Sequence, residues 1–115
     1  MCVSDSFGNI HTAPRNEAVM AGLRLILFCQ ITENCTTIWL YSAPGDNNTT
    51  FLYNGFRIAP NLNTRYEIGK STPKQSHLVI NSAASHHGGM YVCEESKTLL
   101  SAASHLTVIG ERLIM

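Results

Sequence analysis

Cysteine thiols are the side chains of this 115-residue chain with the clearest chemistry. The cysteines are Cys2, Cys29, Cys35 and Cys93. Their spacing fits neither the C-x-x-C pair of a redox centre nor a zinc ribbon, and an even number of such cysteines is typical of disulfides formed in an oxidising compartment. Three N-x-S/T sequons, at Asn34, Asn47 and Asn48, are candidate glycosylation sites and favour the same compartment. We therefore predict an extracellular domain, either secreted or part of the ectodomain of a membrane protein.

The histidines are the other side chains that suggest a reactive site. There are five, and His86 and His87 are adjacent. Adjacent residues do not easily turn both rings toward one ion, and no third ligand lies nearby in sequence, so we interpret the pair as a solvated turn. The sequence contains no G-x-S-x-G, H-E-x-x-H or phosphate-loop motif. It thus indicates no metal, no cofactor and no catalytic residue, and it favours a binding module over an enzyme.

The charge of the chain argues against two classes of partner. Eight basic and eight acidic residues are spread along it, for a net charge of zero. Without a basic stripe, neither nucleic acid nor an anionic membrane surface is a good candidate partner. No run of 18 apolar residues and no signal-peptide pattern is present. We interpret the chain as a mature fragment of something larger, without direct membrane contact of its own.

Alternation of apolar and polar residues predicts the elements that hold these side chains. From Leu23 to Ile31 every odd position is apolar, which predicts a strand with one face in a core. Short strands are also expected at 38–41, 51–53, 65–68, 77–80, 90–93 and 105–109, with one more in the first twenty residues. Eight or nine short strands separated by turns predict an all-β sandwich or barrel.

Several motifs occur in an informative order along the chain. Residues 22–29 are Gly-Leu-Arg-Leu-Ile-Leu-Phe-Cys, Trp39 follows ten residues after Cys29, and residues 89–93 are Gly-Met-Tyr-Val-Cys. This order resembles the immunoglobulin superfamily. The first motif is similar to the second strand of such domains, Trp39 stands where they carry a core tryptophan, and the last motif matches the end of the D-x-G-x-Y-x-C signature. The long separation of Cys29 and Cys93 resembles the variable type, which has additional strands between them.

The resemblance implies one variable-type domain over residues 1–115, a two-sheet antiparallel Greek-key sandwich. A Cys29–Cys93 disulfide would join the two sheets, and Tyr91 would form the tyrosine corner. The expected core residues are Trp39, Tyr91, Leu27, Leu78 and Ile80. A second bridge between Cys2 and Cys35 is compatible with this geometry; the alternatives are a free or interchain Cys2, or a Cys2 that belongs to a hinge.

Two departures from the family pattern are informative. His87 replaces the aspartate of the signature, so the salt bridge of that aspartate to an arginine, here Arg65, is missing or altered. The closing strand has Leu100-Ser101-Ala102-Ala103 in place of the F-G-x-G bulge that follows a joining segment. These residues favour a germline-encoded receptor or adhesion molecule over a rearranged antigen-receptor chain.

The resemblance also predicts a contact surface. If Trp39 and Tyr91 point into the core, their neighbours must point out of the same sheet. The predicted partner-binding residues are Ile38, Leu40, Val92, Glu94 and Leu52. The alternatives to Leu52 are its neighbours Phe51 and Tyr53. We expect this face to bind a protein ligand or a second copy of the domain. The alternative is a structural spacer or soluble decoy, whose apolar face packs on a neighbouring domain.

Overall fold

The computed structural model describes residues 10–12, 16–31, 37–45, 48–55, 57–60, 65–69, 77–95 and 101–110. This part of the chain contains ten strands and one short 3-10 turn, and no α-helix. The elements are β1 (Ile10–Thr12), β2 (Glu17–Met20), β3 (Leu25–Leu27), β4 (Gln30–Ile31), β5 (Thr37–Ser42), β6 (Thr50–Tyr53), β7 (Glu67–Gly69), β8 (His77–Ile80), η2 (Ser85–His87), β9 (Gly89–Glu95) and β10 (Ser101–Ile109). The predicted all-β class is confirmed.

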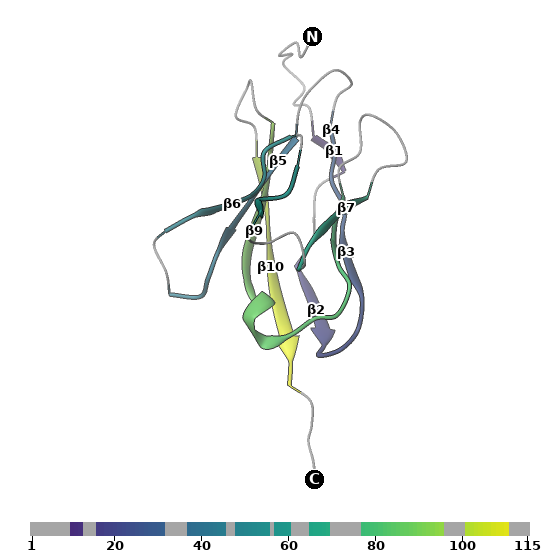
Figure 1. The fold of residues 1–115 in the computed structure, drawn as a ribbon. Helices are drawn as coiled ribbons and strands as arrows, with labels where there is room; N and C mark the ends of the chain where they lie inside the picture. The colour runs from purple at the N-terminus through teal and green to yellow at the C-terminus, as the bar shows by residue number, and fades with distance from the viewer. Residues whose placement is uncertain are drawn as a thin grey trace.

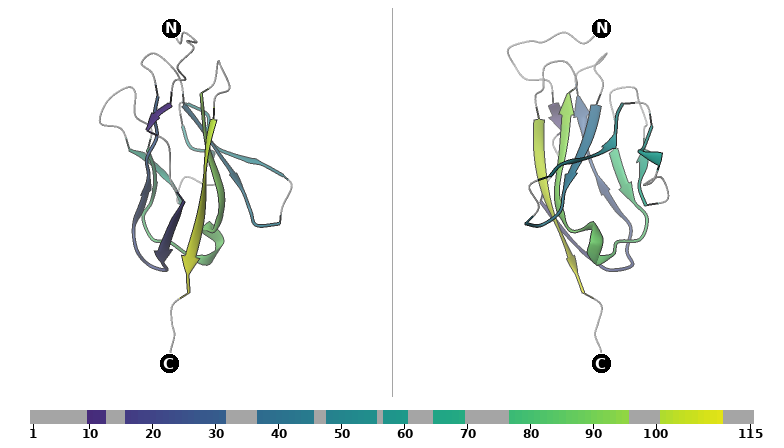
Figure 2. Two further views of the ribbon diagram at one scale, coloured as in Figure 1. Left: turned by 180° about the vertical axis from the view of Figure 1, so that it is seen from behind. Right: turned by 60° about the vertical axis from the view of Figure 1, so that its left-hand side comes forward.

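Two main sheets lie face to face (Figure 1 and Figure 2). One has five strands in the order β2-β10-β9-β5-β6, and the other has three in the order β3-β8-β7. Most pairs are antiparallel, but β2 lies parallel to β10, with Glu17 opposite Leu106 and Met20 opposite Ile109. The predicted two-sheet sandwich is therefore correct, with one parallel pair at the β2 edge.

The strand predicted from Leu23 to Ile31 is interrupted. It forms β3 and β4, and β4 pairs with β1 in a small additional sheet. Between β3 and β4 the backbone N–H of Cys29 donates to the Nδ1 atom of His77 at 3.0 Å, where a continuous ladder would use a backbone carbonyl. The inward orientation predicted for Leu23 is wrong, because Leu23 lies in the turn before β3 and its side chain is 55% exposed.

The core lies between the two main sheets and contains the disulfide between Cys29 and Cys93. Trp39 and Tyr91 come from the five-stranded sheet, and neither side chain is exposed to solvent. The three other expected core residues, Leu27, Leu78 and Ile80, are each at most 1% exposed. Alternate residues of a strand point to opposite faces of the sheet. The buried Trp39 and Tyr91 therefore determine that their direct neighbours in the same strands point outward.

A cluster of hydroxyl groups secures the corner where η2 leads into β9. The Tyr91 hydroxyl donates to the carbonyl oxygen of His87 at 2.6 Å, as in a tyrosine corner. From β5, the Tyr41 hydroxyl donates to the carbonyl oxygen of Gly88 at 2.6 Å. These bonds attach the turn to both central strands of the five-stranded sheet.

His87 does not lie in a solvated turn, contrary to the prediction from sequence. Its side chain is only 3% exposed, whereas His86 is exposed. The Nδ1 atom of His87 accepts the backbone N–H of Ala84 at 2.9 Å, and its ring lies edge-on to Tyr66. Burial, followed by the nearby His86 and Arg65, lowers the pKa of His87 to about 4. At the position where the family signature has an aspartate, this chain therefore carries a buried imidazole that is neutral at physiological pH.

Candidate protein-binding face

The outer face of the five-stranded sheet begins with its two central strands, β5 and β9. Their register places Ile38 opposite Glu94 and Leu40 opposite Val92. All four side chains are half-buried, and the residues between them on each strand are core residues. The four predicted face residues on these strands thus share one surface.

The prediction for Leu52 is wrong, because a β-bulge separates it from this surface. Trp39 pairs with Tyr53 and Leu40 pairs with Phe51, so Leu52 is the additional residue on β6. A bulge shifts the alternation of a strand by one position. Leu52 and Tyr53 are consequently both buried, and Phe51, with 58% of its surface exposed, takes the outward position.

The bulge completes a row of directly opposed side chains across four strands. Phe51 on β6 pairs with Leu40 on β5, Leu40 with Val92 on β9, and Val92 with Ala103 on β10. Ala103 is exposed, like Phe51 at the other end. We call these four residues the apolar row. The sequence predicted its two middle members and gave Phe51 as an alternative to Leu52. It did not predict Ala103, because the register of the outer strands is not encoded in a local pattern.

Polar residues flank the apolar row on both sides. On one side Glu94 lies between Ile38 and Ser101; on the other, Met90 lies between Ser42 and His105. On the side of Met90, the hydroxyl oxygens of Ser42 and Thr49 are 3.3 Å apart. An apolar centre with a polar rim is the usual composition of a protein–protein contact surface.

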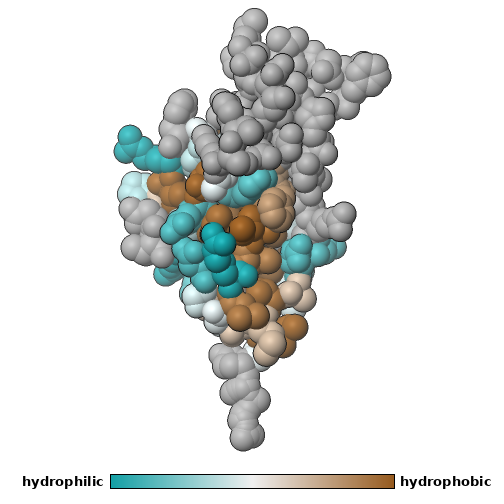
Figure 3. Space-filling model, turned by 90° about the vertical axis from the view of Figure 1, so that its right-hand side faces the viewer, coloured by the Kyte–Doolittle hydropathy of each residue, from teal (hydrophilic) through white to brown (hydrophobic). Residues whose placement is uncertain are grey.

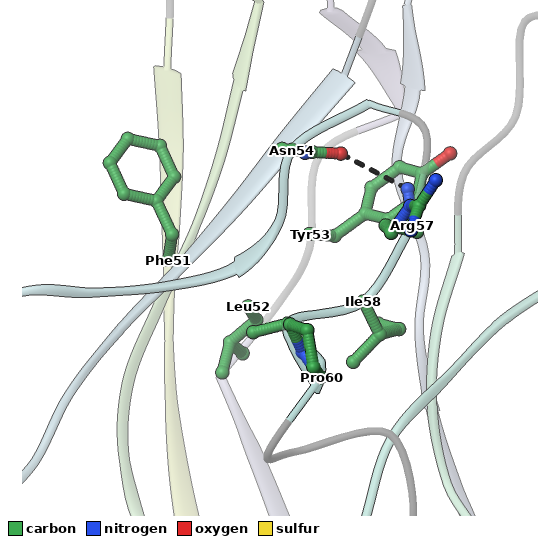
Figure 4. A pocket seen from close by; sticks show the side chains of 8 residues that line it. Phe51, Leu52, Tyr53, Asn54, Arg57, Ile58 and Pro60 are labelled. Carbon is green, nitrogen blue, oxygen red and sulfur yellow. Dashed lines mark hydrogen bonds between the residues drawn. The ribbon is translucent and has the colours of Figure 1, made fainter.

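A small hollow opens beside the row, at the β6 edge of the sheet (Figure 4). Its volume is about 230 Å³, and mainly apolar side chains line it, including Leu52, Ile58 and Pro60. The chain after β6 folds back here, with the Arg57 N–H donating to the Oδ1 atom of Asn54 at 3.0 Å. In Figure 4 Phe51 points away from Tyr53 and Arg57. The aromatic ring of Phe51 therefore lies on one side of β6, and Tyr53 and Arg57 lie on the other.

A second group of exposed apolar residues lies at one end of the sandwich. Met20 pairs with Ile109, and the N–H of Leu23 donates to the carbonyl oxygen of Met20 at 3.1 Å. Each of the three side chains is about half exposed. Figure 3 shows hydrophobic residues reaching the surface at the lower end of the molecule.

Several predicted site residues lie outside the described part of the chain, namely Cys2, Cys35, Asn34 and Asn47. Asn48, the third sequon asparagine, is exposed. Among the residues that the structure describes, no group of three or more His, Cys, Asp or Glu side chains is arranged to hold a metal ion. No helix in these residues has the length and hydrophobicity needed to cross a membrane.

The chain matches no family model and no curated protein sequence. Solved structures do match it. The RIG-5 IG1 homodimer aligns with a TM-score of 0.71 at 13% identity, over 88% of this chain and 96% of that chain. The ZIG-8 IG1 homodimer gives 0.70 at 19% identity, over 90% and 89%. The titin M10–obscurin-like 1 Ig complex gives 0.67 at 18% identity, over 90% and 95%. The chain therefore has the immunoglobulin fold, and β6 paired to β5 is the additional strand of its variable type.

Proposed function

We propose that this chain is an extracellular recognition module of a germline-encoded receptor or adhesion protein. It binds a protein partner through the outer face formed by β6, β5, β9 and β10. The apolar row carries this proposal, because Phe51 and Ala103 are exposed at its ends and the half-buried Leu40 and Val92 connect them. An apolar strip that continues across four strands of a soluble domain is typical of a contact surface.

The structural neighbours support a role in protein contact. Two of them are homodimers of IG1 domains, and a third is a complex between immunoglobulin domains. Binding free energy at such a face comes mainly from desolvating the central apolar side chains, while rim groups such as Glu94 determine which partner fits.

The proposal is tested with the domain itself as a probe. The purified chain, biotinylated and assembled on fluorescent streptavidin, is applied to cells and extracellular matrix of the source organism. We expect the wild-type tetramer to stain a subset of these surfaces, and the Leu40→Arg variant to lose most of that staining because a buried charge at the centre of the contact is strongly unfavourable.

Phe28→Arg is the matched control. Phe28 is an exposed aromatic residue next to β3, in the other sheet, where its ring meets His77 edge-on. The control should stain like the wild type. Equal staining by Leu40→Arg and wild type would refute the assignment of the face.

A second candidate function is a structural spacer that packs against a neighbouring domain. The exposed group of Met20, Leu23 and Ile109 favours it, because these residues lie at the end of the sandwich where β10 finishes. Three results together would favour this alternative. The tetramer would stain no surface, and the isolated domain would be monomeric. In a longer chain that includes a neighbouring domain, Met20→Ser would change the packing of the two domains, whereas Leu40→Arg would not.

A further inference from the structure

We propose that Asn54 is a site of spontaneous deamidation, where the backbone nitrogen of Gly55 attacks the side-chain amide and a neutral residue becomes an acidic one. The site lies in the turn after β6, at the edge of the five-stranded sheet. The reaction consumes water and no other reactant. It does not depend on the proposed function, so either proposal can fail without the other.

The reaction has two steps, which balance without an oxidant or a cofactor. In the first, the backbone nitrogen of Gly55 loses its proton and bonds to the Cγ atom of Asn54, the bond from Cγ to Nδ2 breaks, and the amide nitrogen leaves as ammonia. The product is a five-membered cyclic imide. In the second step one water molecule opens this ring. Opening at the Cγ carbonyl gives aspartate, and opening at the main-chain carbonyl gives isoaspartate, in which the main chain continues through the former side chain.

Gly55 leaves the attacking nitrogen accessible. It has no Cβ atom, so no side chain of its own shields the backbone nitrogen from the Cγ atom. Its φ is +102°, in the region where a residue with a side chain is strained. The turn that ends β6 therefore favours a glycine at the position where a glycine also favours the reaction. This is the one Asn-Gly pair in the sequence.

A hydrogen bond in this turn positions and activates the amide. The Oδ1 atom of Asn54 accepts the backbone N–H of Arg57 at 3.0 Å (Figure 4). The bond folds the amide back over the turn, which reduces the freedom that has to be lost before the attack. An N–H group on the carbonyl oxygen also stabilises the negative charge that develops there when a nucleophile adds to the carbon, as in an oxyanion hole. Asn54 is exposed, so water reaches the imide.

Asn16 and Asn81 are internal controls within the same chain. Both are exposed, and both amides make hydrogen bonds. The Oδ1 atom of Asn16 accepts the backbone N–H of His105 at 2.8 Å, and the Nδ2 atom of Asn81 donates to a carboxylate oxygen of Glu67 at 2.8 Å. They differ from Asn54 in the next residue, which is a glutamate after Asn16 and a serine after Asn81. In both cases a side chain shields the backbone nitrogen.

The two products have different effects on the β6 edge. Both add one negative charge to a chain whose net charge is zero. Aspartate leaves the main chain as it is, and its carboxylate is a stronger acceptor for the Arg57 N–H than the amide. Isoaspartate adds one carbon atom to the main chain inside the turn, which is closed by the Asn54 N–H donating to the Arg57 carbonyl oxygen at 3.3 Å. The added atom should displace the residues after the turn from β6.

The pairing of these residues with β6 reports the displacement. The Ala59 N–H donates to the carbonyl oxygen of Leu52 at 2.9 Å, and Tyr53 forms a bridge with Ile58. All four residues line the hollow at this edge. In the isoaspartate form the amide hydrogen of Ala59 should exchange with solvent at least about tenfold faster, because the loss of its bond exposes it. In the Asn54→Asp variant, which has the side chain of the other product, this exchange should be unchanged.

Incubation of the purified full chain for weeks at physiological temperature and pH tests the proposal. Peptide mapping by mass spectrometry follows the conversion of amide to acid at each asparagine, and a methyltransferase specific for isoaspartate detects that product. We expect position 54 to convert at least about tenfold faster than positions 16 and 81 and to give both products. Asn54→Ser is the variant control. It keeps an oxygen acceptor for the Arg57 N–H but has no amide, so the acidic form should not accumulate.

A parallel incubation in urea separates the effect of the turn from that of the sequence. Gly55 still follows Asn54 in urea, but the bond from the Arg57 N–H is lost. We expect Asn54 to react at least as fast in the folded chain as in urea. A slower reaction in the folded chain would overturn the proposal, because the turn would then protect Asn54. So would a rate equal to that of Asn81, or the formation of aspartate alone, which would indicate direct hydrolysis of the amide without attack by the Gly55 nitrogen.

Discussion

The hydroxyl groups of Tyr66 and Tyr91 lie 3.0 Å apart in the core. Tyr91 donates its single proton to the carbonyl oxygen of His87, so Tyr66 is the donor to Tyr91. Burial raises the pKa of both hydroxyls, which keeps them protonated over the physiological range. The result is a directional chain of hydrogen bonds from Tyr66 through Tyr91 to the turn before β9.

This direction predicts unequal effects of removing the two hydroxyls. Tyr91→Phe breaks two hydrogen bonds and leaves both the His87 carbonyl and the Tyr66 hydroxyl without that partner, so it should destabilise the domain by about 2–3 kcal/mol. Tyr66→Phe breaks one bond and should cost about 1 kcal/mol. Urea denaturation of the two variants measures both values, and equal losses would contradict the direction of the chain.

The buried His87 predicts that stability falls in acid. Its pKa of about 4 lies below the ordinary value of 6.5, so the unfolded chain takes up the proton first. The stabilising effect is complete above pH 6.5 and is lost as the pH falls from 6.5 toward 4, by at most about 3 kcal/mol.

A comparison with His87→Asn isolates this effect, because Asn offers an acceptor to the Ala84 N–H but does not titrate. The difference in unfolding free energy between wild type and variant should change with pH between 4 and 6.5. The charged neighbours that lower the pKa of His87 in addition to burial are His86 and Arg65, and both are present in the variant. Burial also lowers the pKa of His77, with the same sign, but His77 is present in both proteins. A constant difference would show that His87 does not titrate as proposed.

Gly89 should tolerate no side chain. Its φ is +142°, and a Cβ atom there would lie 2.6 Å from the carbonyl oxygen of Ser42 and 2.9 Å from the Tyr41 ring. Backbone strain and steric overlap together predict that Gly89→Ala destabilises the domain by about 3 kcal/mol. Gly45→Ala is the control, since Gly45 has a φ of +74° but open space around it, and it should cost about 1 kcal/mol. Thermal unfolding of both variants tests the difference.

Neighbouring residues at the bulge should separate stability from association. Leu52→Ala removes a buried side chain and is expected to destabilise the domain by about 2–4 kcal/mol with little direct effect on partner binding. Phe51→Ala removes an exposed side chain and should change the unfolding free energy by no more than about 0.5 kcal/mol while it weakens partner binding. Urea denaturation and tetramer staining of both variants check the pair. A large loss of stability for Phe51→Ala and none for Leu52→Ala would show that the bulge lies elsewhere.

The Cys29–Cys93 disulfide should be a major source of stability. It closes a loop over a sequence separation of 64 residues, for which chain entropy predicts about 4 kcal/mol. The double variant Cys29→Ala/Cys93→Ala removes this bond without the use of a reducing agent. Its urea midpoint should fall accordingly, and a loss under about 1 kcal/mol would show that the packing around Trp39 alone holds the sheets together.

Alternation along the chain predicted most of the strands and the faces of β5 and β9. This worked because burial of one face of a strand is written directly into every second residue, as at Trp39 and Tyr91. Alternation failed at Leu52, where a bulge inserts a residue and inverts the pattern, and bulges leave no reliable local signature. The separate interpretation of His86 and His87 as a solvated turn failed at His87, because this ring is buried against Tyr66, a contact that no local sequence pattern signals.

The apolar row could be predicted only in part for the same reason. Leu40 and Val92 are in strands whose inward residues identify the outward ones. Phe51 joins them through the register of β6 on β5, and Ala103 through the register of β10 on β9. The strands of each pair follow each other in the chain, but their register is defined only in the folded chain. A single small residue such as Ala103 carries no hydrophobic signal of its own.

The parallel pairing of β2 with β10 has a mechanical consequence. Because β2 lies near the beginning of the chain and β10 near its end, tension applied to the chain before Glu17 and after Ile109 pulls these two strands in opposite directions along their length. The hydrogen bonds between them are then loaded together in shear, and they must break as a set. The same bonds in an antiparallel terminal hairpin would open one at a time. This edge of the sandwich is therefore built to resist stretching between two attachment points.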